Sequence, residues 1–142
     1  MRFLLVCASA CVILLTGMQA AAAEGCVALT FDDGPDPALT PRLLGILERE
    51  RVVATFYVVG SLVAQHPGIV RKAHEQGHEI GNHSWSHPNL REMRPDAAHQ
   101  QMKKTDAAIL AATGALPLTL RAPYGSMGHA LARSFDRPFV LW

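Results

Sequence analysis

Two pairs of side chains in this sequence are of types that can do hydrolytic chemistry. Asp32 and Asp33 are adjacent. Because neighbouring residues of an extended chain point in opposite directions, one carboxylate can bind a metal while the other handles a proton. His83 and His87 are four residues apart and can converge on one ion if their segment makes a single helical turn. Both histidines with Asp33 make a set that suits zinc or another first-row divalent ion and leaves positions for water and substrate.

Each pair also has an ordinary structural interpretation. Adjacent aspartates often form a turn or cap a helix, and the Gly-Pro at 34–35 that follows them is typical of a turn. Histidine spacing alone is weak evidence, since His74 and His78 are also four residues apart. Gly77 lies between those two and is expected to end a helix there, so we assign His74 and His78 to structure or solvent.

A third group is the run Arg-Ala-Pro-Tyr-Gly at 121–125. An arginine that emerges beside acids would orient a carboxylate through a charge-assisted hydrogen bond. The proline and glycine around Tyr124 fix an uncommon backbone path, which could direct the Tyr124 N–H at a developing oxyanion. A plain surface turn is the alternative. Trp85 and Tyr124 could form stacking walls for a sugar ring, although each could equally belong to the core.

Alternating strand-like and helix-like segments predict an α/β domain in which these groups follow the ends of strands. The segment 52–59 is apolar almost throughout, as expected for a parallel strand that is covered on both faces. Pro67 and Pro95 are typical of helix starts, and Gly77 and Gly114 of helix ends. The predicted strands are 26–31, 52–59, 79–82, 118–121 and 139–142, and the predicted helices are 40–49, 67–76 and 95–113.

Composition limits the class of protein. The 142 residues are 49% hydrophobic and 18% charged, with 13 Lys+Arg against 12 Asp+Glu. These values exclude a disordered polyelectrolyte and a coiled coil, and they allow one domain at most. Because the basic residues are scattered along the sequence, they predict no concentrated positive potential that would bind nucleic-acid phosphates. No nucleic-acid partner is therefore expected.

Residues 1–23 are predicted to be a secretory signal peptide. They combine a short positive start, an apolar run that is brief for a bilayer span, and a cluster of small residues. A membrane anchor is the alternative. Cleavage would leave residues 24–142 as a secreted, periplasmic or cell-wall associated protein with no stable membrane insertion. Of three cysteines only Cys26 would remain, so no internal disulfide is expected.

The predicted domain is incomplete. A full (β/α) barrel needs roughly 200 residues or more, whereas 24–142 supplies about five strands. The sequence also ends on the apolar run Phe-Val-Leu-Trp at 139–142, with no polar tail. We therefore expect a C-terminally truncated barrel, the first part of a longer domain.

The sequence resembles the polysaccharide deacetylases, the NodB-homology domain of carbohydrate esterase family 4, in three blocks whose order and spacing match: 30–35, 83–88 and 121–125. The resemblance implies a distorted (β/α) barrel. It also implies removal of acetyl groups from N-acetylglucosamine units in chitin, chitooligosaccharide or peptidoglycan, or from acetylated xylan. One divalent metal ion is implied as well, with zinc favoured over cobalt or manganese.

The resemblance also implies roles for individual residues. Asp32 is similar to the family's catalytic base, and Arg121 to the arginine that pairs with that base. The Tyr124 amide corresponds to the oxyanion donor. The implied metal ligands are Asp33, His83 and His87, and the implied substrate contacts are Trp85, Pro123 and Tyr124.

Two later blocks of the family pattern, Asp-x-x-Asp-Trp and Leu-x-His, have no counterpart in the sequence. The second supplies the histidine that protonates the leaving amine in the family. We therefore expect metal binding but little or no activity from this chain alone. The alternatives are a xylan O-acetyl esterase of the same family, a deacetylase of small amides and a catalytically silent cell-wall polysaccharide-binding relative. A glycosidase would need two opposed acids and would leave His83 and His87 unexplained.

Overall fold

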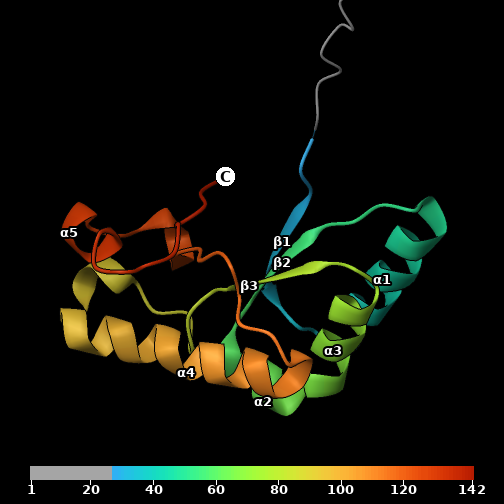
Figure 1. The fold of residues 1–142 in the computed structure, drawn as a ribbon, viewed down its shortest axis with the longest axis horizontal. Coiled ribbons are helices and arrows are strands. Elements are labelled where there is room, and N and C mark those ends of the chain that lie inside the picture. Colours follow the sequence, from blue (N-terminus) through green and yellow to red (C-terminus); the bar gives the residue numbers. More distant parts are fainter. Residues whose placement is uncertain (1–26) are drawn as a thin grey trace, which may run out of the picture.

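A computed structural model describes residues 27–142 and contains a three-stranded parallel sheet with helices packed against it (Figure 1). The strands are β1 (Thr30–Gly34), β2 (Thr55–Val58) and β3 (Glu79–Asn82), in the order β1-β2-β3. Beyond β3 the sheet continues only as single parallel bridges, from Asn82 to Leu120 and from Leu120 to Phe139.

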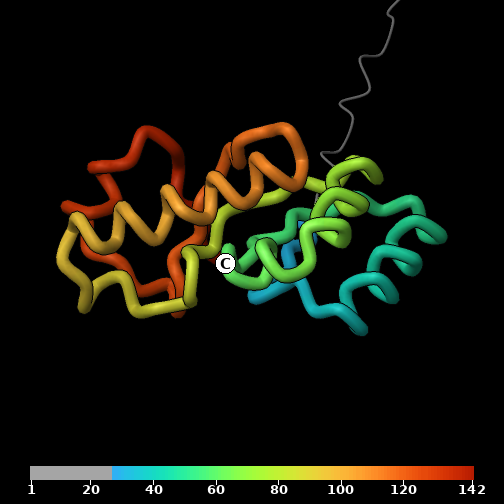
Figure 2. The backbone as a smooth tube through the Cα atoms, turned by 90° about the horizontal axis from the view of Figure 1, so that it is seen from below, coloured from blue at the N-terminus to red at the C-terminus, as the bar shows by residue number. Residues whose placement is uncertain are grey.

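The helices connect the strands and form the layer that covers them. In both views the segment that follows residue 125 lies beside the first half of the longest helix, α4 (Figure 2). No helix within residues 27–142 is long and apolar enough to cross a bilayer. The helices of this part of the chain are α1 (Leu39–Glu50), α2 (Gly60–Gln65), α3 (Pro67–Glu75), α4 (Pro95–Thr113) and α5 (His129–Ala132), with the 3₁₀ turns η1 (Leu90–Glu92) and η2 (Pro123–Gly125).

Side-chain caps and backbone breaks set the ends of the main helices. Asp36 Oδ1 accepts the N–H groups of Ala38 and Leu39 at 2.8 and 2.6 Å, and these bonds lower the pKa of Asp36. They start α1 one residue before the predicted 40–49. The predicted helix 95–113 coincides with α4, because Pro95 lies in its first turn and Gly114 is left-handed.

Some predicted elements differ from the structure. The segments 118–121 and 139–142 are not extended strands, since each contributes one bridging residue. Helix α2 was not predicted, because its six residues carry no side-chain cap and too few apolar positions to show a helical period. The predicted signal peptide, and Cys26 with it, lie outside the described residues.

Two clusters of buried apolar side chains hold the helices in place. The first lies between the sheet, α1, α2, α3 and the second half of α4. The second lies between the first half of α4 and the chain around 120–139. The first includes Leu44, Leu47, Phe56, Val58, Val63, Val70, Ile80 and Ile109. The second includes Leu90, Ala98, Met102, Leu120 and Ala122, with Phe135 and Phe139 packed against them.

Gly60 is a point of close approach at the start of α2. A Cβ added there would lie 2.7 Å from the Trp85 ring and 2.9 Å from Thr105 Cα, which is backbone and cannot move aside.

We predict that Gly60→Ala lowers the free energy of unfolding by about 1–3 kcal/mol. Gly45→Ala in α1, where a Cβ meets nothing within 4 Å, should instead raise it by about 0.5–1 kcal/mol. Urea denaturation followed by circular dichroism tests both, and equal effects would contradict the close packing.

His78 is buried at the start of β3, where it supports the fold and makes it sensitive to acid. Its Nδ1 accepts the Ala54 N–H at 3.2 Å, and its Nε2 has no hydrogen-bond partner among the described residues. Burial lowers the pKa of His78, so the unfolded chain binds this proton more readily than the folded chain. Stability therefore decreases as the pH falls below the pKa of an unfolded histidine, about 6.5.

We predict that wild-type stability falls more steeply between about pH 7 and about pH 5 than the stability of His78→Asn. The asparagine oxygen can accept the Ala54 N–H without taking up a proton. His74→Gln, a change at an exposed histidine on α3, should keep the wild-type dependence. Urea titrations at each pH measure the slopes, and parallel slopes for wild type and His78→Asn would rule out this role.

Candidate metal centre and neighbouring acid

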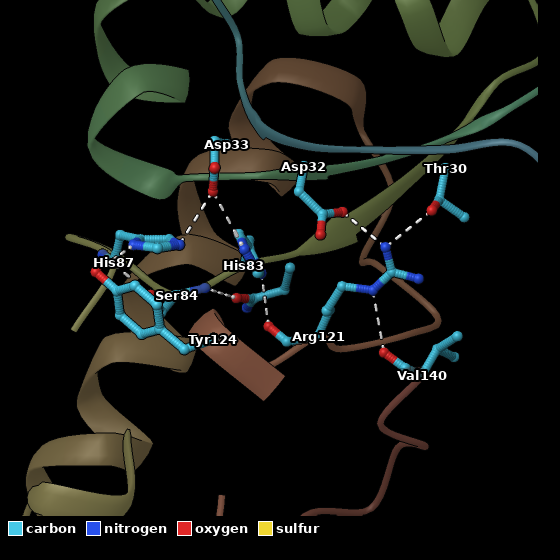
Figure 3. Close-up of polar contacts among 10 residues, drawn as sticks. Thr30, Asp32, Asp33, His83, Ser84, His87, Arg121, Tyr124 and Val140 are labelled. Carbon is cyan, nitrogen blue, oxygen red and sulfur yellow. Dashed lines mark hydrogen bonds and ion pairs between the residues drawn. The ribbon is translucent and has the colours of Figure 1, made fainter. Parts of the chain in front are cut away.

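The two aspartates at the end of β1 face different partners, as their adjacency predicts. Asp33 is left-handed (φ 67°), and the pairing of β1 with β2 shifts register between Phe31 and Gly34. This turn sends the Asp33 carboxylate toward the two histidines, while the Asp32 carboxylate meets Arg121 (Figure 3). The two acids can therefore take separate chemical tasks.

The structure brings Asp33, His83 and His87 together. One ligand atom of each residue lies within 4.8 Å of the ligand atoms of the other two. Within residues 27–142, these three side chains therefore form a group that could hold a metal ion. The two histidines converge without the single helical turn that their spacing would allow. The loop 83–87, here called the metal-ligand loop, is irregular, and left-handed conformations at Ser84 (φ 67°) and His87 (φ 57°) bring the rings together instead.

His83 is oriented as a neutral metal ligand. Its Nδ1 lies 2.8 Å from the Arg121 carbonyl, which can only accept, so Nδ1 carries the proton. In the neutral ring Nε2 then points a lone pair at Asp33 Oδ1, 3.3 Å away. Burial lowers the pKa of His83, outweighing the opposite effects of the Arg121 carbonyl and the two aspartates. Two lone pairs at this distance repel unless a cation lies between them, so the donor set fits a metal ion.

His87 completes this donor set from the more exposed side. Its Nε2 lies 3.0 Å from Asp33 Oδ1, and its Nδ1 lies 3.2 Å from the Tyr124 hydroxyl. The Tyr124 and His87 rings meet edge to face with centroids 4.7 Å apart. The sequence interpretation gave Tyr124 a role through its amide and a possible stacking role through its ring. It missed this contact with His87, for which the sequence carries no signal.

Arg121 is buried, with 2% of its side chain exposed, and it fixes the position of Asp32. Its NH1 donates to Asp32 Oδ1 at 2.7 Å and to Thr30 Oγ1 at 2.9 Å, and its Nε donates to the Val140 carbonyl at 3.1 Å. The guanidinium also lies over the Tyr57 ring, 4.0 Å from the centroid. The second Asp32 oxygen has no donor among the described residues, which leaves it available to a proton.

The chain after Arg121 adopts the uncommon path that its proline and glycine indicate. Tyr124 is left-handed (φ 58°), and Pro123 is buried beneath it. The amides of Gly125 and Ser126 each donate to the carbonyl three residues back along the turn, at Ala122 and Pro123. Within residues 27–142 the Tyr124 amide has no hydrogen-bond acceptor.

Trp85 has neighbours that restrict its predicted role as a sugar platform. One edge of its ring packs against Gly60, and the Lys104 ammonium lies 3.8 Å from the ring centroid. The structure therefore places Trp85 between α2 and α4. A sugar could reach this ring face only after Lys104 moves away.

Comparison with known proteins identifies the family. The sequence model described as Polysaccharide deacetylase matches residues 19–136. Peptidoglycan-N-acetylglucosamine deacetylase PgdA of Listeria monocytogenes is 43% identical over 82% of this chain and 25% of its own length. A chitooligosaccharide deacetylase of a Bradyrhizobium species is 45% identical over 70% of this chain and 46% of its own length. The structure of a family 4 acetyl xylan esterase from Clostridium thermocellum in complex with a cobalt ion is 42% identical, with a TM-score of 0.75 over 79% of this chain and 55% of that one.

The chain thus spans between a quarter and about half of the length of these relatives. Within that span the match includes the three blocks that carry the aspartates, the histidines and Arg121. The parallel sheet and its helices correspond to an incomplete barrel of the same type. The chain belongs to the polysaccharide deacetylase family.

Proposed function

We propose that this chain carries the metal-ligating and proton-accepting residues of a deacetylase that hydrolyses N-acetyl groups on N-acetylglucosamine units, releasing acetate. One observation carries the proposal: the ligand atoms of Asp33, His83 and His87 lie within 4.8 Å of one another, and Asp32 is the neighbour of Asp33 on β1. Hydrolysis of an amide needs a strong nucleophile and an acceptor for its proton, and this arrangement provides for both.

The protein residues have separable parts in this reaction. Asp33, His83 and His87 would hold a divalent ion, zinc in preference to cobalt or manganese, because two imidazoles and a carboxylate suit it. Such an ion, when bound, would polarise the acetyl carbonyl and lower the pKa of a bound water. Asp32, held by Arg121, accepts the proton of the attacking water through its second oxygen.

The negative charge that develops on the carbonyl oxygen needs a donor from the protein. The amide of Tyr124 is suited to this because its left-handed backbone leaves the N–H without a competing acceptor in the described structure. Removing one donor of this kind typically costs a factor of about 10² to 10³ in rate.

Peptidoglycan and chitooligosaccharide are the proposed substrates, because relatives with those names share over 40% of the aligned residues. Acetylated xylan is the alternative within the family. We also propose that the protein acts outside the cytoplasm, since residues 1–23 have the pattern of a secretory signal. An extracellular polymer would then meet the enzyme in the secreted, periplasmic or cell-wall compartment.

Metal binding is tested most directly at His87. We predict that His87→Gln lowers zinc affinity by at least about 10-fold, because it removes one of three ligand atoms. His74→Gln, an exposed histidine outside the cluster, is the matched control and should bind zinc like the wild type. Isothermal titration calorimetry measures both. Equal zinc affinities in the two variants would contradict the proposed metal centre.

The base is tested by Asp32→Asn. The amide oxygen can still accept from Arg121, so we expect the fold and the zinc affinity to be kept. Because little activity is expected from this chain alone, acetate release from a chitin oligomer is measured with the segment carried in a full-length family domain, where Asp32→Asn should lower it by a factor of about 10² to 10⁴ relative to the zinc-loaded unmutated domain. Release that resists both this change and a chelator would contradict the mechanism. An unmutated full-length domain that binds the oligomer without releasing acetate would indicate the silent binding relative instead.

A further inference from the structure

The metal-ligand loop needs support beyond its own residues. Ser84 and His87 hold left-handed conformations, which non-glycine residues keep only when surrounding contacts determine them. Part of this support is local, because Ser84 Oγ accepts the His87 N–H at 3.1 Å. The Ser84 N–H must also be held, since it is the first amide after His83. Its acceptor is a side chain outside the loop.

That acceptor is Asn82, the last residue of β3, which is fully buried. Its Oδ1 accepts the Ser84 N–H at 2.8 Å. Its Nδ2 donates to the Met102 carbonyl at 2.8 Å and to Asp106 Oδ1 at 2.7 Å, so both amide protons are used. The Asn82 amide nitrogen faces two acceptors and its oxygen faces one donor. Only one of the two orientations of the amide therefore satisfies all three hydrogen bonds. A backbone carbonyl and a carboxylate of α4 thus orient the group that holds the loop.

Asp106 is fixed in turn by an arginine from the far end of the chain. Arg137 donates through NH2 to Asp106 Oδ2 at 2.6 Å and through NH1 to Asp106 Oδ1 at 3.1 Å. The same NH1 donates to the Pro117 carbonyl at 2.9 Å. Only 16% of the Asp106 side chain and 23% of the Arg137 side chain is exposed. A two-point ion pair of this kind fixes direction as well as distance, so Asp106 meets Asn82 in one geometry.

We propose that Asn82 and Asp106 are positioning residues of the metal centre: Asp106, clamped by Arg137, orients the Asn82 amide, and that amide sets the backbone from which His83 and His87 project. Neither residue touches the ligand atoms. Their effect reaches the centre through the Ser84 N–H, and loss of an outer partner of metal ligands typically costs 10- to 100-fold in metal affinity. This inference rests on the metal binding proposed above.

The test compares cobalt binding by the whole chain and its Asp106→Asn variant. An asparagine at 106 cannot accept from Asn82 and pair with Arg137 at two points, so the amide of Asn82 loses its fixed partner. We expect cobalt affinity to fall by about 10-fold and the visible absorption spectrum of bound cobalt to change. Ile109→Val, a buried change on the same helix, is the matched control and should lower stability while leaving affinity and spectrum unchanged.

A second comparison tests whether Asp106 acts through Asn82. The double variant Asn82→Ala/Asp106→Asn should lose no more affinity than Asn82→Ala alone, whereas additive losses would contradict the shared path. If Asp106→Asn fails to fold, Arg137→Gln removes the clamp and should show the same loss in milder form. If these variants bind cobalt with the affinity and the absorption spectrum of the wild type, the positioning role is overturned and the proposed function is unaffected. Absence of cobalt binding by the wild type would overturn the proposed function and this inference with it.

Discussion

A buried positive charge, the guanidinium of Arg121, constrains the arrangement of the whole site. With 2% of its side chain exposed, it must be paired, because removing a partner from a buried ion pair typically costs about 3–5 kcal/mol. Asp32 is that partner. The Val140 carbonyl and the Tyr57 ring contact other parts of the guanidinium. The Tyr57 ring lies so close to Gly81 that a Cβ there would overlap it. The position of the acid therefore depends on packing between neighbouring strands.

Left-handed backbone conformations are concentrated at the candidate site. Five non-glycine residues among residues 27–142 have a positive φ. Four of them, Asp33, Ser84, His87 and Tyr124, lie within or beside the candidate site, and the fifth, Arg51, follows the end of α1. Such conformations are unfavourable for L residues and persist where surrounding bonds determine them. Here the bonds come from side chains rather than from a sheet ladder, as with the Asn82 amide that accepts the Ser84 N–H. This explains how an irregular loop can hold ligands in a fixed arrangement.

Much of this site could be predicted from the sequence, and the part that could not has a physical reason. Adjacent acids after a strand, and histidines after another, were expected to meet because parallel strands end at one edge. The geometry between His83 and His87 was not predictable, since spacing indicates a helical turn and the left-handed residues depend on distant contacts. Asn82, Asp106 and Arg137 were missed for the same reason: their bonds join segments far apart in sequence, and no local pattern marks them.

The bridge between Asn82 and Leu120 shows how little sheet the site requires. The Arg121 N–H donates to the Asn82 carbonyl at 2.9 Å, and the Asn82 N–H donates to the Thr119 carbonyl at 3.1 Å. This pair of bonds sets the register at one point, and the residues that follow on each side are His83 and Arg121. Their adjacency gives the His83 ring its carbonyl acceptor and leaves Nε2 facing Asp33. The site therefore does not require the extended strand predicted at 118–121. One residue in the correct register, Leu120, is enough to bring His83 and Arg121 together.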